Sequence, residues 1–125
     1  IMGNTYHASQ ISETNISDIL YDLGFSPSHR GYHYIKRSVS LIVNVNNDYL
    51  FNLTKMLYPQ IAQEFKTTPA NVERSIRYAI NAALSKTFSR SDQTVFIDIY
   101  TFNNCKLTNS QFLAALVDYL RNNHC

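Results

Sequence analysis

The sequence predicts an all-α domain of five to six helices that contains a helix-turn-helix. Apolar residues recur at helical spacing along most of the chain, as they do on the buried face of a helix. Residue types that start or end helices stand at the borders of several of these stretches. One segment, residues 94–102, alternates like a strand, and a lone strand without a partner would not be stable.

Length and composition fit one domain with its own core. The chain has 125 residues, of which 45% are hydrophobic and 16% are charged. A domain of this size buries enough surface to fold without disulfides or metals. We expect the polar residues 1–11 to form a linker or disordered N-terminal segment, and residues 12–125 to form the helix-turn-helix domain.

Cysteine content, hydropathy and charge restrict the class of protein further. Cys105 and Cys125 cannot form a framework that stabilises the fold, and no secretory signal precedes them, so we expect reduced thiols and a cytoplasmic protein. No apolar run approaches the ~18 residues that span a bilayer, so we expect no membrane contact. The net charge of +2 is too small to identify a nucleic-acid-binding protein by itself.

The first helix is predicted to end at Gly24. Four apolar residues before it lie at helical spacing: Ile16, Ile19, Leu20 and Leu23. A glycine in this position is a common helix C-terminus. Pro27 and Gly31 then bracket a predicted loop.

Two further helical patterns follow. The second pattern consists of Ile35, Val39, Ile42 and Val43. The asparagine-rich residues 44–48 predict a turn after it. The third pattern repeats at Leu53, Leu57, Ile61 and Phe65. Pro59 lies inside this third pattern, so the proline either kinks one helix or begins a new one.

The last two helices have clear starting signals. Thr68 can cap a helix whose first residue is Pro69, and this helix continues to about Phe88. A capping box at residues 108–111 begins the final helix. The apolar stripe of that helix consists of Phe112, Leu116, Val117 and Leu120.

The helix that begins at Pro69 is the candidate recognition helix, which we place at residues 69–86. At about 100° per residue, five apolar side chains share one arc and should face the core. They are Val72, Ile76, Ala79, Ile80 and Ala83. Glu73 lies nearer the core and can pair with Arg77 at i+4. The candidate DNA-binding residues on the opposite side, its flank and the preceding turn are Thr67, Thr68, Asn71, Arg74, Ser75, Arg77, Tyr78 and Asn81.

These residue types suit the major groove of DNA. Arginine can form two hydrogen bonds with guanine, and asparagine can form two with adenine. Arginine and tyrosine also reach backbone phosphates. A short helix, a tight turn and a longer basic-faced helix fit a helix-turn-helix. The pattern is equally typical of an ordinary solvated helix face, and taken alone it leaves both interpretations open.

The sequence offers no basis for catalysis or metal binding. The histidines His7, His29, His33 and His124 show no metal-ligand spacing, and the three scattered glycines cannot form a phosphate-binding loop. No pairing of a nucleophile with a base can be inferred. We therefore expect no enzyme activity, no catalytic or metal site and no cofactor. The alternative to a DNA-binding regulator is a helical protein–protein interaction module.

Four segments resemble one known family. Residues 54–62 match the pattern T-K-x-L-Y-P-x-I-A, and residues 67–80 match T-T-x-x-x-V-E-R-x-I-R-H-A-I at most positions. Residues 106–112 resemble K-P-T-N-S-E-F, and residues 31–34 resemble G-Y-x-Y. The family is the C-terminal DNA-binding effector domain of the stage-zero sporulation master response regulator of Firmicutes. The likeness extends over residues 12–122.

This resemblance implies a six-helix domain that reads a short GC-containing DNA box. It implies that residues 94–102 form a helix or an irregular loop rather than a strand. It also implies partners: double-stranded DNA, bound as a tandem homodimer on repeated boxes, a sigma factor of RNA polymerase, and a receiver domain N-terminal to this one in the parent protein.

Two positions depart from the family pattern. The family usually has arginine where this chain has Asn71, and histidine where it has Tyr78. Because asparagine favours adenine and arginine favours guanine, we expect the preferred DNA box to carry an A·T pair in place of one G·C pair.

Overall fold

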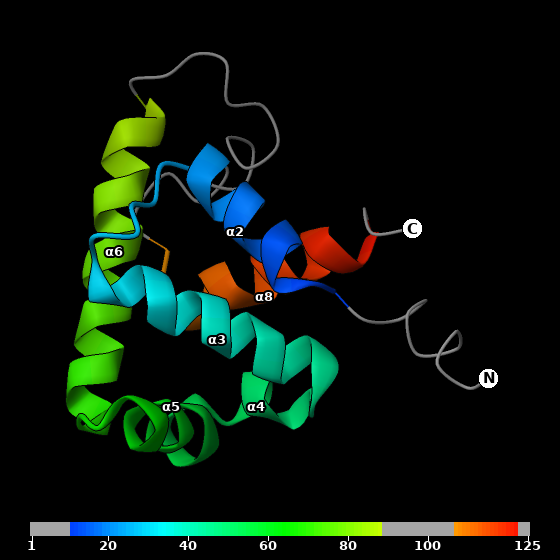
Figure 1. The fold of residues 1–125 in the computed structure, drawn as a ribbon, viewed down its shortest axis with the longest axis vertical. Coiled ribbons are helices and arrows are strands. Elements are labelled where there is room, and N and C mark those ends of the chain that lie inside the picture. Colours follow the sequence, from blue (N-terminus) through cyan, green and yellow to red (C-terminus); the bar gives the residue numbers. More distant parts are fainter. Residues whose placement is uncertain (1–10, 89–106, 123–125) are drawn as a thin grey trace.

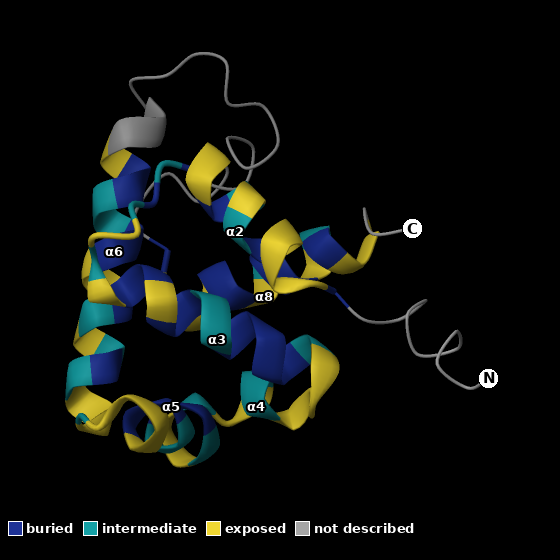
Figure 2. Cartoon of the chain, in the orientation of Figure 1, coloured by how far each residue is buried: buried dark blue, intermediate teal, exposed yellow. Residues whose placement is uncertain are grey.

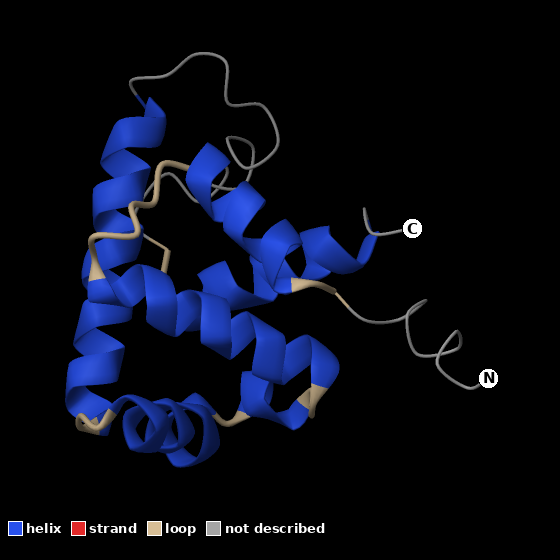
Figure 3. Ribbon diagram, viewed as in Figure 1, coloured by secondary structure: helices blue, strands red, loops and turns tan. Residues whose placement is uncertain are grey.

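The computed structural model describes residues 11–88 and 107–122. In this part of the chain every regular element is helical, which confirms the all-α prediction (Figures 1 and 3). The elements are α2 (Glu13–Asp22), α3 (Arg30–Asn44), α4 (Asp48–Phe51), the π-helical turn η1 (Leu53–Leu57), α5 (Tyr58–Phe65), α6 (Pro69–Phe88) and α8 (Asn109–Asn122). Residues 1–10, predicted as linker, and residues 94–102 lie outside the described residues.

Helix α3 is the central element of the core. It contacts α6, α2, α8, α4 and α5, and it crosses the middle of the molecule in Figure 1. Figure 2 shows that the buried faces of the surrounding helices turn toward one another. The largest fully buried side chains are Phe112, Ile16, Leu20, Leu23, Ile35, Ile42, Leu57, Ile61, Ile76 and Ile80. Removing this apolar surface from water is the main stabilising contribution to the fold.

Helix α2 ends at Asp22, and Gly24 occupies the C-terminal glycine position just beyond the helix, as predicted. Gly24 has a φ of 98°, a left-handed conformation that glycine adopts without strain. Its N–H donates to the carbonyl of Tyr21, and the N–H of Phe25 donates to the carbonyl of Leu20, both at 3.0 Å. These two bonds form a Schellman motif, which satisfies carbonyls that the helix end leaves free.

Helix α3 begins before Gly31, so the prediction that Gly31 closes a loop is wrong. The loop ends at His29, and Gly31 is the second residue of α3. A Cβ atom at Gly31 would lie 2.2 Å from the carbonyl oxygen of Ser75 and 2.7 Å from the Cβ of Ala79. The glycine is therefore required by the close approach of α3 to α6 and not by a turn.

The third predicted pattern divides at Pro59 into two elements. The turn η1 is closed by bonds that span five residues, such as Leu57 N–H to the carbonyl of Asn52 at 3.2 Å. Pro59 is then the second residue of α5, a position near the start of a helix where proline is tolerated. Phe65, predicted as part of the apolar stripe, is 42% exposed, and its ring forms a T-shaped pair with the Tyr34 ring.

Ile11, the last residue of the predicted linker, is joined to the end of α3. Ile11 is buried in the core. Its N–H donates to Oδ1 of Asn44, and its carbonyl accepts from Nδ2 of the same side chain, at 3.1 and 3.0 Å. This pair of bonds to the end of α3 requires an amide side chain at residue 44, where the sequence indicated only a turn.

The capping box of the last helix is confirmed. Thr108 Oγ1 accepts from the N–H of Gln111, and Gln111 Oε1 accepts from the N–H of Thr108, both at 3.0 Å. The predicted stripe of Phe112, Leu116, Val117 and Leu120 is buried.

Replacing Gly31 by alanine should destabilise the domain by about 3 kcal/mol, because the added methyl group collides with backbone atoms of α6. Helix propensity alone would make the same change stabilising by about 1 kcal/mol. Urea unfolding of the parent and of Gly31→Ala, monitored by circular dichroism, shows whether the substitution lowers or raises the free energy of unfolding. A variant more stable than the parent would contradict the close contact.

Candidate nucleic-acid interface

Three residues connect α5 to α6, a length typical of a helix-turn-helix. They are Lys66, Thr67 and Thr68. Lys66 has φ 56° and ψ 51°, the left-handed conformation, and this reverses the chain direction. The N–H of Thr67 then donates to the carbonyl of Ala62 at 2.9 Å. The turn is thus fixed by backbone geometry at the end of α5.

Helix α6 starts as predicted. Thr68 Oγ1 accepts from the N–H of Asn71 at 3.1 Å, and the carbonyl of Thr68 accepts from the N–H of Val72 at 3.0 Å. Pro69 occupies the first helical position. The cap aligns the first turn of α6 with the preceding turn, so residues 67–71 form one continuous surface.

The division of α6 into a buried and an exposed face is confirmed. Five side chains are at most 1% exposed: Val72, Ile76, Ala79, Ile80 and Ala83. Arg74 and Tyr78 lie on the opposite side, where the Tyr78 side chain is 64% exposed. Figure 2 shows this exposed strip along the outer side of α6, away from the other helices.

Three of the predicted residues form a hydrogen-bonded chain across the turn and the first two turns of α6. Asn71 Nδ2 donates to Thr67 Oγ1 at 3.1 Å, and Asn71 Oδ1 accepts from Nη2 of Arg74. The sequence placed these residues near one another but did not predict the chain. Since an amide group has two N–H donors and two lone pairs on its oxygen, Asn71 keeps one of each for a ligand.

Two other predicted residues lie where α3 meets α6. Ser75 is partly buried, because its carbonyl faces Gly31 at the start of α3. The Tyr78 ring packs edge-on against His29, with the ring centres 5.7 Å apart. Tyr78 is therefore oriented by α3, and Ser75 is less accessible than its position on the helix predicted.

The remaining predicted residues lie on the other flank, beside α8. Arg77 pairs with Glu73 at 3.1 Å, as predicted. Asn81 and this ion pair line a cavity of about 610 Å³ between α6 and the first turn of α8. On the same side Asn109 Nδ2 donates to the hydroxyl of Tyr58 at 3.0 Å and to the carbonyl of Glu73 at 3.1 Å. Asn109 ties α8 to α5 and α6, a role that its place in a capping box did not reveal.

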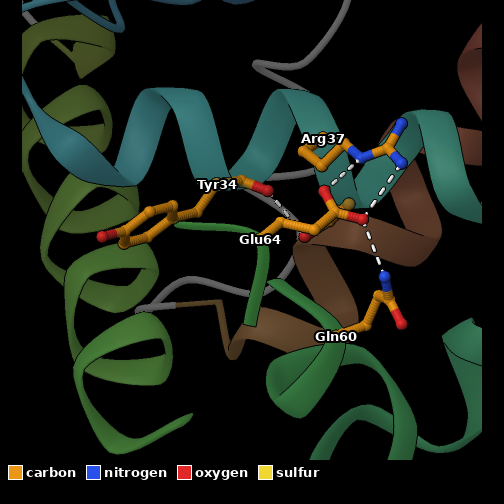
Figure 4. A network of polar contacts seen from close by, with 5 residues as sticks. Tyr34, Arg37, Gln60 and Glu64 are labelled. Carbon is orange, nitrogen blue, oxygen red and sulfur yellow. Dashed lines mark hydrogen bonds and ion pairs between the residues drawn. The ribbon is translucent and has the colours of Figure 1, made fainter. Parts of the chain in front are cut away.

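A second polar network fixes α5 against α3 (Figure 4). Arg37 on α3 donates two hydrogen bonds to the Glu64 carboxylate, at 2.7 and 3.1 Å. Gln60 Nε2 donates to the same carboxylate at 2.8 Å. The bond from Arg37 holds the pKa of Glu64 below its ordinary value. Glu64 lies two residues before Lys66, so the network holds the last turn of α5 against α3.

Two further properties concern the part of the chain formed by residues 11–88 and 107–122. No cluster of three or more His, Cys, Asp or Glu side chains in this part could hold a metal ion. Among the described helices, none combines the length and the apolar character needed to cross a membrane. Of the histidines, His33 is hydrogen-bonded through Nε2 to the carbonyl of Pro27 at 2.7 Å, whereas His7 and His124 lie outside the described residues.

Comparison with known families identifies the domain. Residues 16–120 match the family described as sporulation initiation factor Spo0A C terminal. The chain belongs to this family. The match begins in α2, ends in α8 and includes the whole surface of α6. The Spo0A C-terminal family consists of sporulation-type DNA-binding effector domains and not of enzymes.

The Glu64→Gln variant should be less stable than the parent by about 0.5–1 kcal/mol at neutral pH, since both partners are partly exposed. The pKa of Glu64 is lowered by folding, so this difference is present above the ordinary value of 4.5 and disappears as the pH falls below it. Urea unfolding of the parent and the variant at several values from about pH 3 to about pH 7 measures this difference in the free energy of unfolding.

The matched control for this prediction is Arg37→Gln. Its free energy of unfolding should fall by a similar amount. The double variant should be little less stable than either single variant, because the two side chains contribute through the same interaction. Strictly additive losses would show that Arg37 and Glu64 stabilise the fold independently.

Proposed function

We propose that this domain is a sequence-specific DNA-binding transcription regulator of the sporulation response-regulator type. In this proposal α5 and α6 act as a helix-turn-helix, and residues 69–86 of α6 enter the major groove. The observation that carries it is the exposed face of α6, which presents Arg74, Asn71 and Tyr78 while its opposite face is buried in the core. A helix fixed in this way can insert its outer side chains into a groove without rearranging.

Each residue of the exposed face is proposed to have a distinct role. Arg74 lies at the centre of the face and can bond a guanine edge through two N–H groups. Asn71 retains one donor and one acceptor, which is what an adenine edge requires. Thr67 and Tyr78 are placed to reach phosphates through their hydroxyls. Arg77 and Asn81 would contact the opposite strand from the α8 flank.

The wider setting is proposed from family membership. The parent protein would carry a receiver domain before this one, act in a two-component system in the cytoplasm, and contact a sigma factor of RNA polymerase. On DNA the domain would bind as a tandem homodimer, because one recognition helix contacts only a few base pairs.

A protein–protein interaction module is the second candidate. Val45 and Phe51 are large apolar side chains that are 64% and 73% exposed, near the end of α3 and in α4. Burial of both side chains against a partner would remove apolar surface from water, which favours association. They lie away from α6, so this candidate differs from the first in which surface is used (Figure 1).

Arg74→Ala should weaken binding to the preferred duplex by about 1–3 kcal/mol and binding to unrelated duplexes much less, because the lost contact is to a base. Fluorescence anisotropy on a duplex selected from a random library measures both. Arg121→Ala, which removes an equal charge at the far end of α8, is the matched control and should bind like the parent. If Arg74→Ala binds as tightly as the parent, α6 is not in the interface and the protein–protein module becomes the better proposal.

Changing Asn71→Arg together with Tyr78→His should shift preference toward the GC-containing box of the family. The expected gain is about 1–3 kcal/mol for each recovered base contact. Competition binding between that box and one with a single A·T replacement measures the shift. Asn71→Ala is the control: it breaks the bonds to Thr67 and Arg74 without adding a guanidinium, so it should lose affinity without acquiring the new preference. A parent that already prefers the GC box would show that Asn71 does not read a base.

Two boxes spaced one helical turn apart should be bound more tightly than one, and cooperatively, if the domains pair on DNA. Binding curves on one box and on two boxes decide this. If the affinity per box is the same on the one-box and the two-box duplex, the tandem homodimer is ruled out. That result would not bear on base reading by α6.

A further inference from the structure

A cavity of about 400 Å³ opens beside the turn that joins α5 to α6. Its lining residues come from the first turns of α3 and from the turn itself: Arg30, His33, Tyr34, Phe65, Lys66 and Thr67. The buried Tyr34 and the Phe65 ring, which pack edge to face with centres 5.0 Å apart, provide its apolar wall. Arg30, Lys66 and Thr67 bring hydrogen-bond donors to its rim, whereas Nε2 of His33 is bonded to the carbonyl of Pro27.

The electrostatic character of this cavity is positive. Arg30 and Lys66 are exposed cations, and no carboxylate is among the lining residues. Within the described residues neither cation is paired with an acid, whereas Arg37 and Arg77 are both paired. Two unpaired cations beside the hydroxyl of Thr67 form a site for an anion with several acceptor oxygens.

The position of the cavity beside α6 indicates which anion it would bind. Thr67, which lines it, accepts a hydrogen bond from Asn71, so the cavity wall continues into the chain that ends at Arg74. Arg30 precedes Gly31, which touches α6 at Ser75. The cavity therefore lies along one edge of the exposed face of α6. A helix in the major groove has a row of phosphates on either side of it.

We propose that this cavity binds a backbone phosphate of the same DNA duplex that α6 reads. The inference rests on the proposed function of α6 and extends it to a second, sequence-independent site. Arg30 and Lys66 contribute the charge, and the Thr67 hydroxyl joins the phosphate contact to the base-reading residues. Phosphate contacts of this kind set the register of a recognition helix on the duplex.

Two substitutions remove the charges without disturbing the fold. Arg30→Gln keeps a long helix-forming side chain. Lys66→Asn keeps a residue that tolerates the left-handed conformation observed there. Each should weaken binding to the selected duplex and to unrelated duplexes by the same factor. Each should also lower the slope of log Kobs against log salt concentration by about 0.9, the value for one lost phosphate contact.

The control is Arg121→Gln, which removes a charge at the opposite end of the molecule from α6 (Figure 1). It should change neither affinity nor salt slope by a comparable amount. If Arg30→Gln and Lys66→Asn behave like Arg121→Gln, the phosphate site is overturned.

Neutral methylphosphonate linkages, placed one at a time along each strand of the selected duplex, locate the contact. One such linkage beside the groove should weaken binding of the parent protein to the duplex by about tenfold. This loss corresponds to one charge-assisted hydrogen bond. The double variant Arg30→Gln with Lys66→Asn should be insensitive at that linkage and should retain the sensitivity of the parent elsewhere. Equal sensitivity of parent and double variant at every linkage would contradict the proposal.

Arg74→Ala separates this inference from the proposed function. If Arg74→Ala loses the preferred sequence while the cavity variants bind normally, α6 reads DNA and only the phosphate site is wrong. If neither Arg74→Ala nor the cavity variants alter binding, the interface lies elsewhere and both proposals fail.

Discussion

The contact between α3 and α6 at Gly31 is the constraint on which the rest of the structure depends. Only a residue without a Cβ allows the backbones to approach this closely. The approach buries the inner face of α6 against the central helix and fixes which side chains of α6 remain outside. It also brings His29, just before α3, and Arg30, the first residue of α3, to the edge of the exposed face.

Polar contacts then fix the orientation of the same helix from its other sides. Asn109 joins α8 to the backbone of α6 and to Tyr58, and the Arg37–Glu64 pair holds α5 in place before the turn. Each of these bonds contributes modestly to the free energy of unfolding, because each replaces bonds to water. Their joint effect is geometric: α5, the turn and α6 have one arrangement, and the exposed face is preorganised for a ligand.

The features that could be predicted from the sequence are those with local causes. The cap at Thr68, the capping box at Thr108 and the glycine after α2 depend on neighbouring residues, and helical periodicity separated the two faces of α6. Gly31 was misplaced because the atoms that exclude a side chain belong to Ser75 and Ala79, far away in the sequence. The flanks of the site escaped prediction for the same reason, since α3 partly covers Ser75 and α8 adjoins Arg77.

The hydrogen-bonded chain from Thr67 through Asn71 to Arg74 has an evolutionary consequence. Because Asn71 orients both the turn and the central arginine, a substitution at residue 71 changes the setting of its neighbours as well as its own contact. Residues coupled in this way do not have additive effects. A lineage that altered its DNA target at this face would therefore have accumulated compensating substitutions in a restricted order, with epistasis determining which intermediates stayed functional.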